Sequence, residues 1–287
     1  MSYLPTINEP AYLELLDEVL RTGNRTTDRT GVGTLSVFGR QIRYTLGNQI
    51  PVFTTKQVHW KSVVHELLWF LSGSTDNKVL QSNGVKIWDA WATEDACAKY
   101  GRREGDLGPI YGFQWRHFGE KYTTCDAKYQ GFDQISWVIR EIIKNPSSRR
   151  LIVNGWNPND AEKVSLPPCH TLFQFHVQGD RLSCHLFQRS ADLLLGVPFN
   201  VASYSLLTHM IAHLTGLKAH EFVHTMSNAH IYMNHIDAVQ TQLKRIPYAA
   251  PRLTLSNLVS NIFEFRSDHI TLEDYVCHPK IPAPVAI

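Results

Sequence analysis

The sequence lacks the features that mark secreted, membrane-spanning and nucleic-acid-binding proteins. Its N-terminus, Met-Ser-Tyr-Leu-Pro-Thr, has neither the basic start nor the apolar run of a secretory signal. No apolar stretch approaches the ~20 residues that span a bilayer. Charge of one sign is also scarce, because 28 lysines and arginines nearly balance 26 aspartates and glutamates. A dedicated nucleic-acid binder would carry a basic stripe or tail. We therefore expect a soluble, cytoplasmic protein.

Cysteine is sparse and irregularly spaced. The 5 cysteines are widely scattered and form no C-x-x-C pair, so we expect neither a disulfide framework nor a structural zinc site. Among the 14 histidines, His65-Glu66 begins like the zinc motif H-E-x-x-H, but Trp69 replaces the second histidine. His209 and His213 could form the metal pair of a metal-dependent hydrolase. Their predicted helix is apolar on nearly every side, so core histidines are the preferred interpretation, and no metal is expected.

The chain contains one block of regular elements after another, with no repeat or linker. Helical spacing predicts helices over residues 12–20, 61–71, 135–143, 200–214 and 236–243. Asn8 and Asn200 are the predicted N-caps of the first and fourth. Alternation predicts strands over 34–46, 151–156, 172–177 and 182–189, with a bulge at Gly39-Arg40. Because helices and strands come in blocks, we predict one α+β domain over residues 1–287, with a mixed or antiparallel sheet covered by helices.

Cys169 is the first candidate for chemistry. In Leu166-Pro-Pro-Cys-His170 the thiol precedes a predicted strand, and two prolines rigidify its approach. This context alone supports catalysis and core packing equally. Arg189 ends the partner strand of the same hairpin, and a nearby guanidinium would lower the thiol pKa and favour the attacking thiolate. His170 is a poor base for a cysteine hydrolase, because adjacent strand residues point to opposite faces. Cys184, in contrast, is expected to be a core residue.

Arginines and one glutamate complete the candidates found from residue chemistry. Asp28-Arg-Thr-Gly31, Arg149-Arg150 and Arg189-Ser190 each place arginine between or at the ends of predicted elements. The planar fork of arginine suits phosphate, so several converging arginines would bind a phosphomonoester. Glu66 lies at the edge of an apolar helix face. It is either solvated or a partly buried acid with a raised pKa, suited to proton transfer.

Motifs along the whole chain resemble those of the thymidylate synthase family, which includes pyrimidine hydroxymethylases. They are Asp28-Arg-Thr-Gly-Val-Gly-Thr34, Thr54-Thr-Lys56, His65-Glu-Leu-Leu-Trp-Phe-Leu71, Ile87-Trp-Asp-Ala-Trp91, Leu107-Gly-Pro-Ile-Tyr-Gly-Phe-Gln-Trp-Arg116, Ser148-Arg-Arg150, Pro168-Cys-His170, Gln188-Arg-Ser-Ala-Asp192, Leu195-Gly-Val-Pro-Phe-Asn200, Ala229-His-Ile-Tyr-Met-Asn-His235 and Ala283-Pro-Val-Ala-Ile287. Their occurrence in family order makes the resemblance specific.

The resemblance implies that Cys169 attacks C6 of the uracil ring of dUMP. It implies that 5,10-methylenetetrahydrofolate supplies the one-carbon unit and the hydride that give dTMP, without a metal. The implied catalytic residues are Cys169, Glu66, Tyr111, Asn200 and Asp192. The implied dUMP-binding residues are Arg29, Arg149, Arg150, Arg189, Ser190, Asp192, Asn200, His230 and Tyr232. The implied folate-binding residues are His59, Trp88, Trp91, Asp192, Gly196, Phe199, Ala286 and Ile287.

The resemblance also implies a homodimer formed through a sheet face, with Arg149 and Arg150 donated to the partner's site. Asn200 stands where family members that act on dCMP have aspartate, which favours dUMP. The alternative reaction adds water in place of hydride and gives 5-hydroxymethyl-dUMP; Trp88 and the complete C-terminal segment favour hydride. Ser227-Asn228, His176 and Phe187 depart from the residues usual in the family, and these positions flank the nucleotide pocket.

Overall fold

A central mixed β-sheet organises the chain. The computed structural model describes residues 8–27 and 30–286. Its six-stranded sheet has the order β1-β2-β6-β5-β4-β3, and β5 and β6 run parallel while the other neighbours are antiparallel. The strands are β1 (Asn24–Thr26), β2 (Thr34–Thr45), β3 (Ile152–Asn154), β4 (His170–Gln178), β5 (Arg181–Asp192) and β6 (Lys218–Tyr232). The predicted α+β class with a mixed sheet is confirmed.

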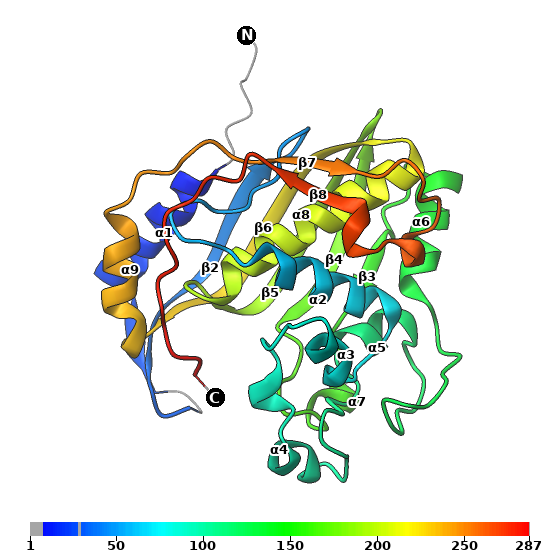
Figure 1. Cartoon of the computed structure of the whole chain (residues 1–287), viewed down its shortest axis with the longest axis horizontal. Coiled ribbons are helices and arrows are strands. Elements are labelled where there is room, and N and C mark those ends of the chain that lie inside the picture. Colours follow the sequence, from blue (N-terminus) through cyan, green and yellow to red (C-terminus); the bar gives the residue numbers. More distant parts are fainter. Residues whose placement is uncertain (1–7, 28–29, 287) are drawn as a thin grey trace.

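Helices cover the sheet (Figure 1). All five predicted helices are present, as α1 (Glu9–Thr22), α2 (Trp60–Ser72), α6 (Gln134–Lys144), α8 (Gly196–Thr215) and α9 (Ile236–Leu243). Shorter helices are α3 (Asn77–Ser82), α4 (Glu94–Ala98), α5 (Tyr111–Arg116) and α7 (Pro158–Ala161), and β7 (Arg252–Leu255) pairs with β8 (Ile270–Glu273) in a small second sheet. Among the described helices, none combines the length and the hydropathy needed to cross a membrane.

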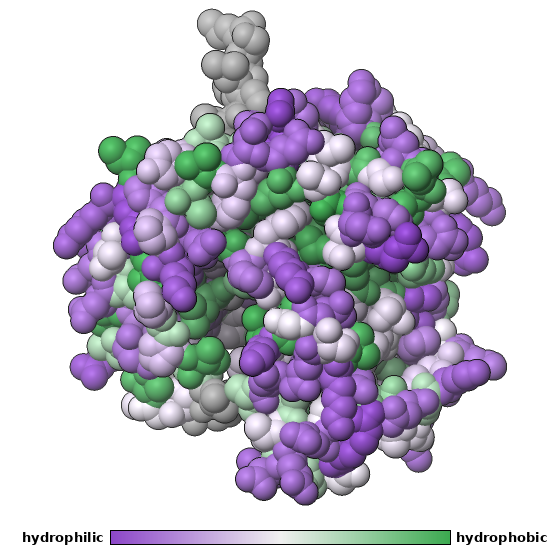
Figure 2. Space-filling model, in the orientation of Figure 1, coloured by the Kyte–Doolittle hydropathy of each residue, from purple (hydrophilic) through white to green (hydrophobic). Residues whose placement is uncertain are grey.

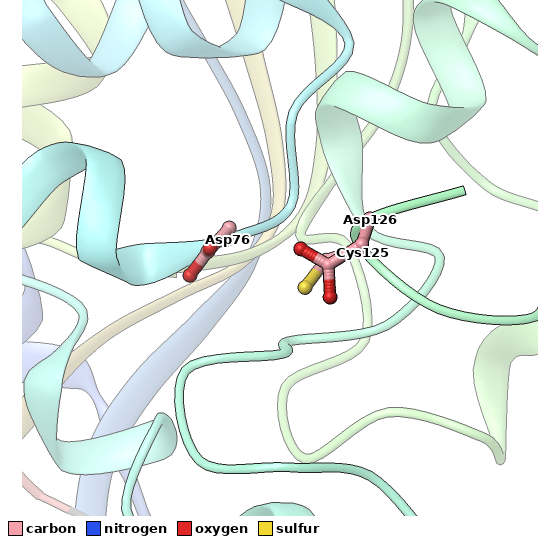
Figure 3. Close-up of side chains that lie close together, drawn as sticks. All are labelled: Asp76, Cys125 and Asp126. Carbon is pink, nitrogen blue, oxygen red and sulfur yellow. The ribbon is translucent and has the colours of Figure 1, made fainter. Parts of the chain in front are cut away.

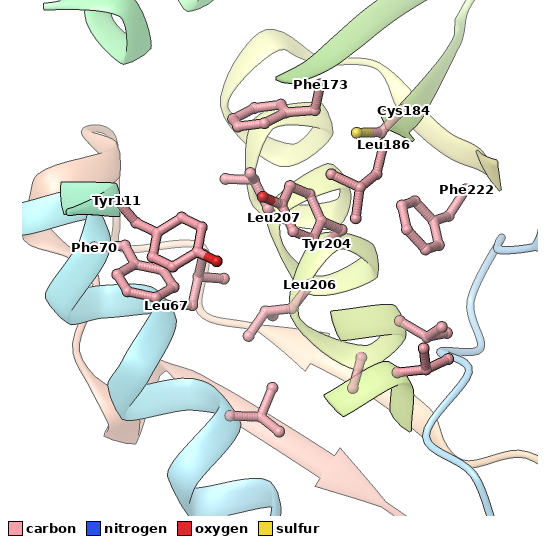
Figure 4. Packing of buried hydrophobic residues seen from close by; sticks show 14 of the residues in the cluster. Leu67, Phe70, Tyr111, Phe173, Cys184, Leu186, Tyr204, Leu206, Leu207 and Phe222 are labelled. Carbon is pink, nitrogen blue, oxygen red and sulfur yellow. The ribbon is translucent and has the colours of Figure 1, made fainter. Parts of the chain in front are cut away.

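Helix α8 forms the middle of the core. It is apolar on nearly all sides because β5 and β6 contact it on one side and α2 on the other. The ring of Tyr204 stacks on Phe222 of β6 with centroids 6.0 Å apart, and Figure 4 shows this packing continuing through Phe173 and Leu186. The helix begins at Gly196, so Asn200 lies inside it and the predicted N-cap at Asn200 is wrong. Pro198, which is favoured in a first turn, marks the true start.

The predicted bulge at Gly39-Arg40 is also wrong. The register of β2 against β6 is the same on both sides of this point, from Phe38↔Asn228 to Arg40↔Met226, so neither strand carries an extra residue. Gly39 has φ +70°, a conformation that glycine adopts without strain. At this point the alternation of inward and outward side chains shifts by one residue in both strands, β2 and β6. This shift explains the phase change seen in the sequence.

Candidate active site

Cys169 lies where the start of β4, the end of β5 and the start of α5 meet. Its backbone N–H donates to the hydroxyl of Tyr111 at 2.7 Å. The guanidinium of Arg189 donates to Pro167 O at 2.8 Å and to Pro168 O at 2.9 Å, and its Nη2 lies 3.7 Å from Cys169 Sγ. The thiol is therefore held by backbone and by a cation, as the sequence predicts for a functional cysteine.

The effect of Arg189 on the thiol is smaller than expected. Burial raises the pKa of Cys169, while Arg189 and Tyr111 oppose this rise. The expectation of a net lowered pKa is therefore wrong for the protein without substrate, because desolvation of the thiolate outweighs the guanidinium. Cys184, as expected, is a core residue with 1% of its surface exposed.

Glu66 and Tyr111 lie on neighbouring elements in this region. Glu66, on α2, is partly buried and accepts a hydrogen bond from Trp88 Nε1 at 2.7 Å. Burial raises its pKa to about 7, against the opposing effect of Trp88. Of the two alternatives that the sequence leaves open for Glu66, the partly buried acid is therefore correct. Tyr111 is 3% exposed, and its ring lies 4.9 Å from that of Phe70 (Figure 4). An acid with a pKa near neutrality can both give and take a proton at physiological pH.

Asn200 projects from the first turns of α8 toward the end of β5. Its Oδ1 accepts a hydrogen bond from Gln188 Nε2 at 3.1 Å, and 9% of the residue is exposed. Gly196, one turn earlier, lies between Asn200 and Asp192, since a Cβ built on it would be 3.6 Å from atoms of both side chains. The predicted Asn200, Asp192 and Gly196 are therefore neighbours.

Asp192 ends β5 and organises the turn into α8. Its Oδ1 accepts from the backbone N–H groups of Leu194 and Leu195 at 3.0 and 3.3 Å. His235, which is fully buried, places Nδ1 3.9 Å from the same oxygen. The other ring nitrogen of His235 donates to Pro284 O at 2.7 Å, so the C-terminal segment that contains Ala286 is attached beside Asp192. Ile287 lies outside the described residues.

The predicted phosphate-binding arginines do not all meet within one chain. Arg149 and Arg150 are exposed after α6, where they line a hollow of about 330 Å³ with Glu141, Asn145, Ser147 and Ser148. The backbone oxygen of Arg149 accepts from Gln174 in the middle of β4, whereas the guanidinium of Arg189 donates to Pro167 and Pro168, before that strand begins. Arg29 lies outside the described residues. Arg189 and Ser190 follow one another along β5 beside the thiol.

His230 and Tyr232 end β6, the strand next to β5. Their rings lie 5.1 Å apart. His230 Nδ1 lies 2.9 Å from Asn228 Oδ1, so one of the unusual residues at 227–228 contacts a predicted nucleotide-binding residue. Because the amide oxygen accepts, Nδ1 of His230 donates to Asn228.

The predicted folate-binding residues include two tryptophans in contact. The rings of Trp88 and Trp91 lie 5.8 Å apart, and Trp91 Nε1 is buried without a hydrogen-bond partner among the described residues. Phe199 and Gly196 are partly buried at the start of α8, whereas His59 is exposed and hydrogen-bonds to Ser62 Oγ at 2.7 Å. The two indole rings meet edge to face at an interplanar angle of 63°, and such an aromatic pair provides apolar contact for the pterin ring of a folate. The face drawn in Figure 2 is mostly hydrophilic, interrupted by hydrophobic residues.

A cluster of metal-ligand residue types lies elsewhere. Ligand atoms of Asp76, Cys125 and Asp126 lie within 4.8 Å of one another (Figure 3). Arg103 Nη2 donates to Asp76 at 2.9 Å and to Asp126 at 2.8 Å, so one guanidinium already pairs with both carboxylates. His209, on α8, pairs with Gln49 O at 3.2 Å, as a core histidine would.

Sequence reasoning missed Gln188 and His235, which contact Asn200 and the C-terminal segment respectively. Both occur in the quoted motifs, but a polar residue's contacts depend on pairing between distant elements. Together, a cysteine held by a guanidinium, an acid with a pKa near 7 and a restrained amide define an enzyme site equipped for covalent and acid–base chemistry.

Comparison with known proteins agrees with this class. The family model described as thymidylate synthase matches residues 10–287. Thymidylate synthase of equine herpesvirus 2 (strain 86/87) is 52% identical over 284 residues, which cover 97% of this chain and 98% of that protein. The human enzyme (Homo sapiens) is 51% identical over 288 residues, or 99% of this chain and 92% of the human protein. The chain belongs to the thymidylate synthase family, as its motifs predict.

Proposed function

We propose that the chain methylates dUMP to dTMP and that Cys169 is the nucleophile. The observation that carries the proposal is the convergence of Arg189 and Tyr111 on Cys169, in a chain whose family membership extends over nearly its whole length. The relatives reported above carry the name thymidylate synthase, and they give no support to the alternative, hydroxymethylation of dUMP.

The thiol adds to C6 of the uracil ring, and the electron pair of the C5–C6 double bond moves toward C5 and O4. This covalent step makes C5 nucleophilic, so one difficult substitution becomes two easier ones. Because burial raises the thiol pKa, the proton must leave before attack. Arg189 favours that loss by stabilising the thiolate.

Glu66 and Tyr111 move protons around the ring. Glu66, with a pKa of about 7, exchanges a proton at O4 through water, and Tyr111 assists removal of the proton from C5. Asn200 donates to O4 and accepts from N3–H. Arg29, Arg189 and Ser190 hold the 5′-phosphate, and His230 and Tyr232 bind the 3′-hydroxyl.

5,10-Methylenetetrahydrofolate, when bound, supplies the one-carbon unit and the hydride. Trp88 and Trp91 bind its pterin, Asp192 hydrogen-bonds to it, and His59, Gly196 and Phe199 complete the pocket. Ala286 and Ile287 close it and exclude water, which would otherwise add in place of hydride. The proposal includes no metal.

The proposal also includes a homodimer in the cytoplasm, paired through the open sheet face. The exposed positions of Arg149 and Arg150 in the single chain support it, because two arginines outside their own site are free to complete a partner's phosphate site. Residues 1–287 form one catalytic domain in this proposal.

The test is product identification. Protein, dUMP and 5,10-methylenetetrahydrofolate are mixed, dihydrofolate is followed by its absorbance, and the nucleotide is identified by mass. We expect equal amounts of dTMP and dihydrofolate. Formation of 5-hydroxymethyl-dUMP without dihydrofolate, or no nucleotide product, would refute the proposal.

A further inference from the structure

A buried chain of hydrogen bonds lies behind Asn200. Gln188 Nε2 donates to Asn200 Oδ1 at 3.1 Å and to the backbone oxygen of Ser190 at 2.8 Å. Gln188 Oε1 lies 2.8 Å from His224 Nε2. Gln188 is 2% exposed and His224 is 0% exposed, so water cannot replace these partners. His224 lies on β6, one strand away from the residues that surround Cys169.

The direction of each hydrogen bond follows from one fixed group. A backbone carbonyl only accepts, so the nitrogen of Gln188 must face Ser190 O. The amide oxygen then faces His224, and because this oxygen only accepts, the histidine must donate from Nε2. Burial lowers the pKa of His224 to about 3, so the ring is neutral and has one proton. Its Nδ1 is then bare, in agreement with its lack of a hydrogen-bond partner among the described residues.

This direction fixes the side-chain amide of Asn200. Its oxygen faces Gln188, and the side chain of His170 also interacts with this amide. The orientation matters because a half-turn of a primary amide exchanges its donor and its acceptor. Uracil offers N3–H and the O4 acceptor, whereas cytosine offers the N3 acceptor and a 4-amino donor. An asparagine free to turn could therefore pair with either base.

We propose that His224 is a positioning residue that gives the site its preference for uracil over cytosine, by holding Gln188 so that Asn200 cannot turn. The inference rests on the proposed function, in which Asn200 contacts the pyrimidine. Of the described residues, His224 alone donates to Gln188 Oε1. Ser190 O holds the nitrogen of the Gln188 amide, and His224 holds its oxygen. Without His224 this buried oxygen is unsatisfied, so Gln188 shifts from its position and no longer restrains Asn200.

The test compares dUMP with dCMP as substrates and as ligands. His224→Phe keeps a planar ring and removes the donor. We expect the ratio of kcat/KM for dUMP to that for dCMP to fall by roughly tenfold, with the same trend in the two Kd values. His224→Gln restores an N–H donor and should recover part of the ratio. His213→Phe is the control, because His213 lies near the end of α8 that is distant from Asn200. It should leave the ratio unchanged.

If His224 had a structural role alone, its loss would weaken the binding and turnover of both nucleotides by the same factor, and the ratio would be unchanged. That result would overturn the inference. If His224→Phe does not fold, Gln188→Met removes the donor to Asn200 directly and must lower the ratio too; an unchanged ratio there also overturns it. Measurements on the unmodified protein distinguish a failure of this inference from a failure of the proposed function. Failure to bind or prefer dUMP rejects the proposed function and this inference together, whereas a preference for dUMP that survives in the variants rejects this inference alone.

Discussion

At the scale of single residues, the site combines groups whose ionisation is set mainly by burial. The raised pKa of Cys169 and the value of about 7 for Glu66 have desolvation as their largest cause. The sequence predicted both residues as candidates, and it predicted Arg189 beside the thiol. It could not predict the net shift at Cys169, because the depth of burial depends on elements far apart in the chain.

The first prediction concerns Glu66. Its pKa rises from an ordinary 4.5 to about 7 on folding, so between these values the folded protein holds a proton that the unfolded chain has lost. The contribution of Glu66 to the free energy of unfolding therefore falls as the pH rises between these two pKa values. In Glu66→Gln we expect that component to disappear from the pH dependence of unfolding. We also expect kcat to drop by about 10²- to 10⁴-fold and the ionisation near pH 7 to vanish from the rate profile.

Glu264→Gln provides the control, because Glu264 is exposed on a short 3₁₀ turn. It should change neither the rate profile nor the pH dependence of unfolding. A Glu66→Gln variant that retains the ionisation near pH 7 would assign that ionisation to another group.

At the scale of elements, the long helices and the β4–β5 hairpin were predictable, and β6 was not. The inward positions of β6 include His224 and His230, both buried, so apolar and polar residues do not alternate cleanly. The change of phase at Ser227 breaks the pattern again. A strand with polar residues on its buried side is recognised only when its hydrogen-bond partners are known, and the partner of His224 is Gln188 on β5. The prediction that Asn200 is an N-cap was wrong for a related reason. Asparagine is a common N-cap, but this one is buried in the first turns of the helix.

The second prediction concerns the junction of α1 with the 54–57 turn. Glu9 is 4% exposed, and its carboxylate accepts from the backbone and hydroxyl groups of Thr54 and Thr55 at 2.6–3.0 Å. Glu9→Gln turns an amide NH₂ toward some of these donors and leaves them unsatisfied. We expect a loss of about 3 kcal/mol in the free energy of unfolding, measured in denaturant at fixed protein concentration.

Glu14→Gln is the matched control, because Glu14 is exposed on the same helix. It should change stability by less than about 0.5 kcal/mol. If the two variants are equally stable, the hydrogen bonds of Glu9 do not secure this junction.

At the scale of the whole molecule, the resemblance implied a dimer that a single chain cannot display. The block pattern of the sequence predicted a mixed or antiparallel sheet covered by helices, and the mixed sheet is confirmed; the order of its strands was not predicted. The partner, and the prediction that residues 1–287 act as one catalytic domain, stay predictions. Arg149 and Arg150 connect the two questions, because they are exposed and are not hydrogen-bonded to Arg189 or Ser190.

The third prediction uses mixed dimers. Cys169→Ala and the double variant Arg149→Ala, Arg150→Ala should each be nearly inactive. If the arginines serve the partner's site, a mixed dimer has one complete site, formed by the cysteine of one protomer and the arginines of the other. Random mixing of equal amounts makes half the dimers mixed, so we expect about a quarter of unmodified activity per site. Mixtures as inactive as their components would place the arginines in their own protomer's site.

The central claim, that Cys169 is the nucleophile, is tested most directly by the turnover of Cys169→Ala. We predict that this variant binds dUMP with a Kd close to that of the unmodified protein and loses roughly 10⁴-fold or more in kcat. Cys184→Ala, at a core cysteine of β5, should retain turnover wherever it folds. A Cys169→Ala variant that forms dTMP within tenfold of the unmodified rate would contradict the account.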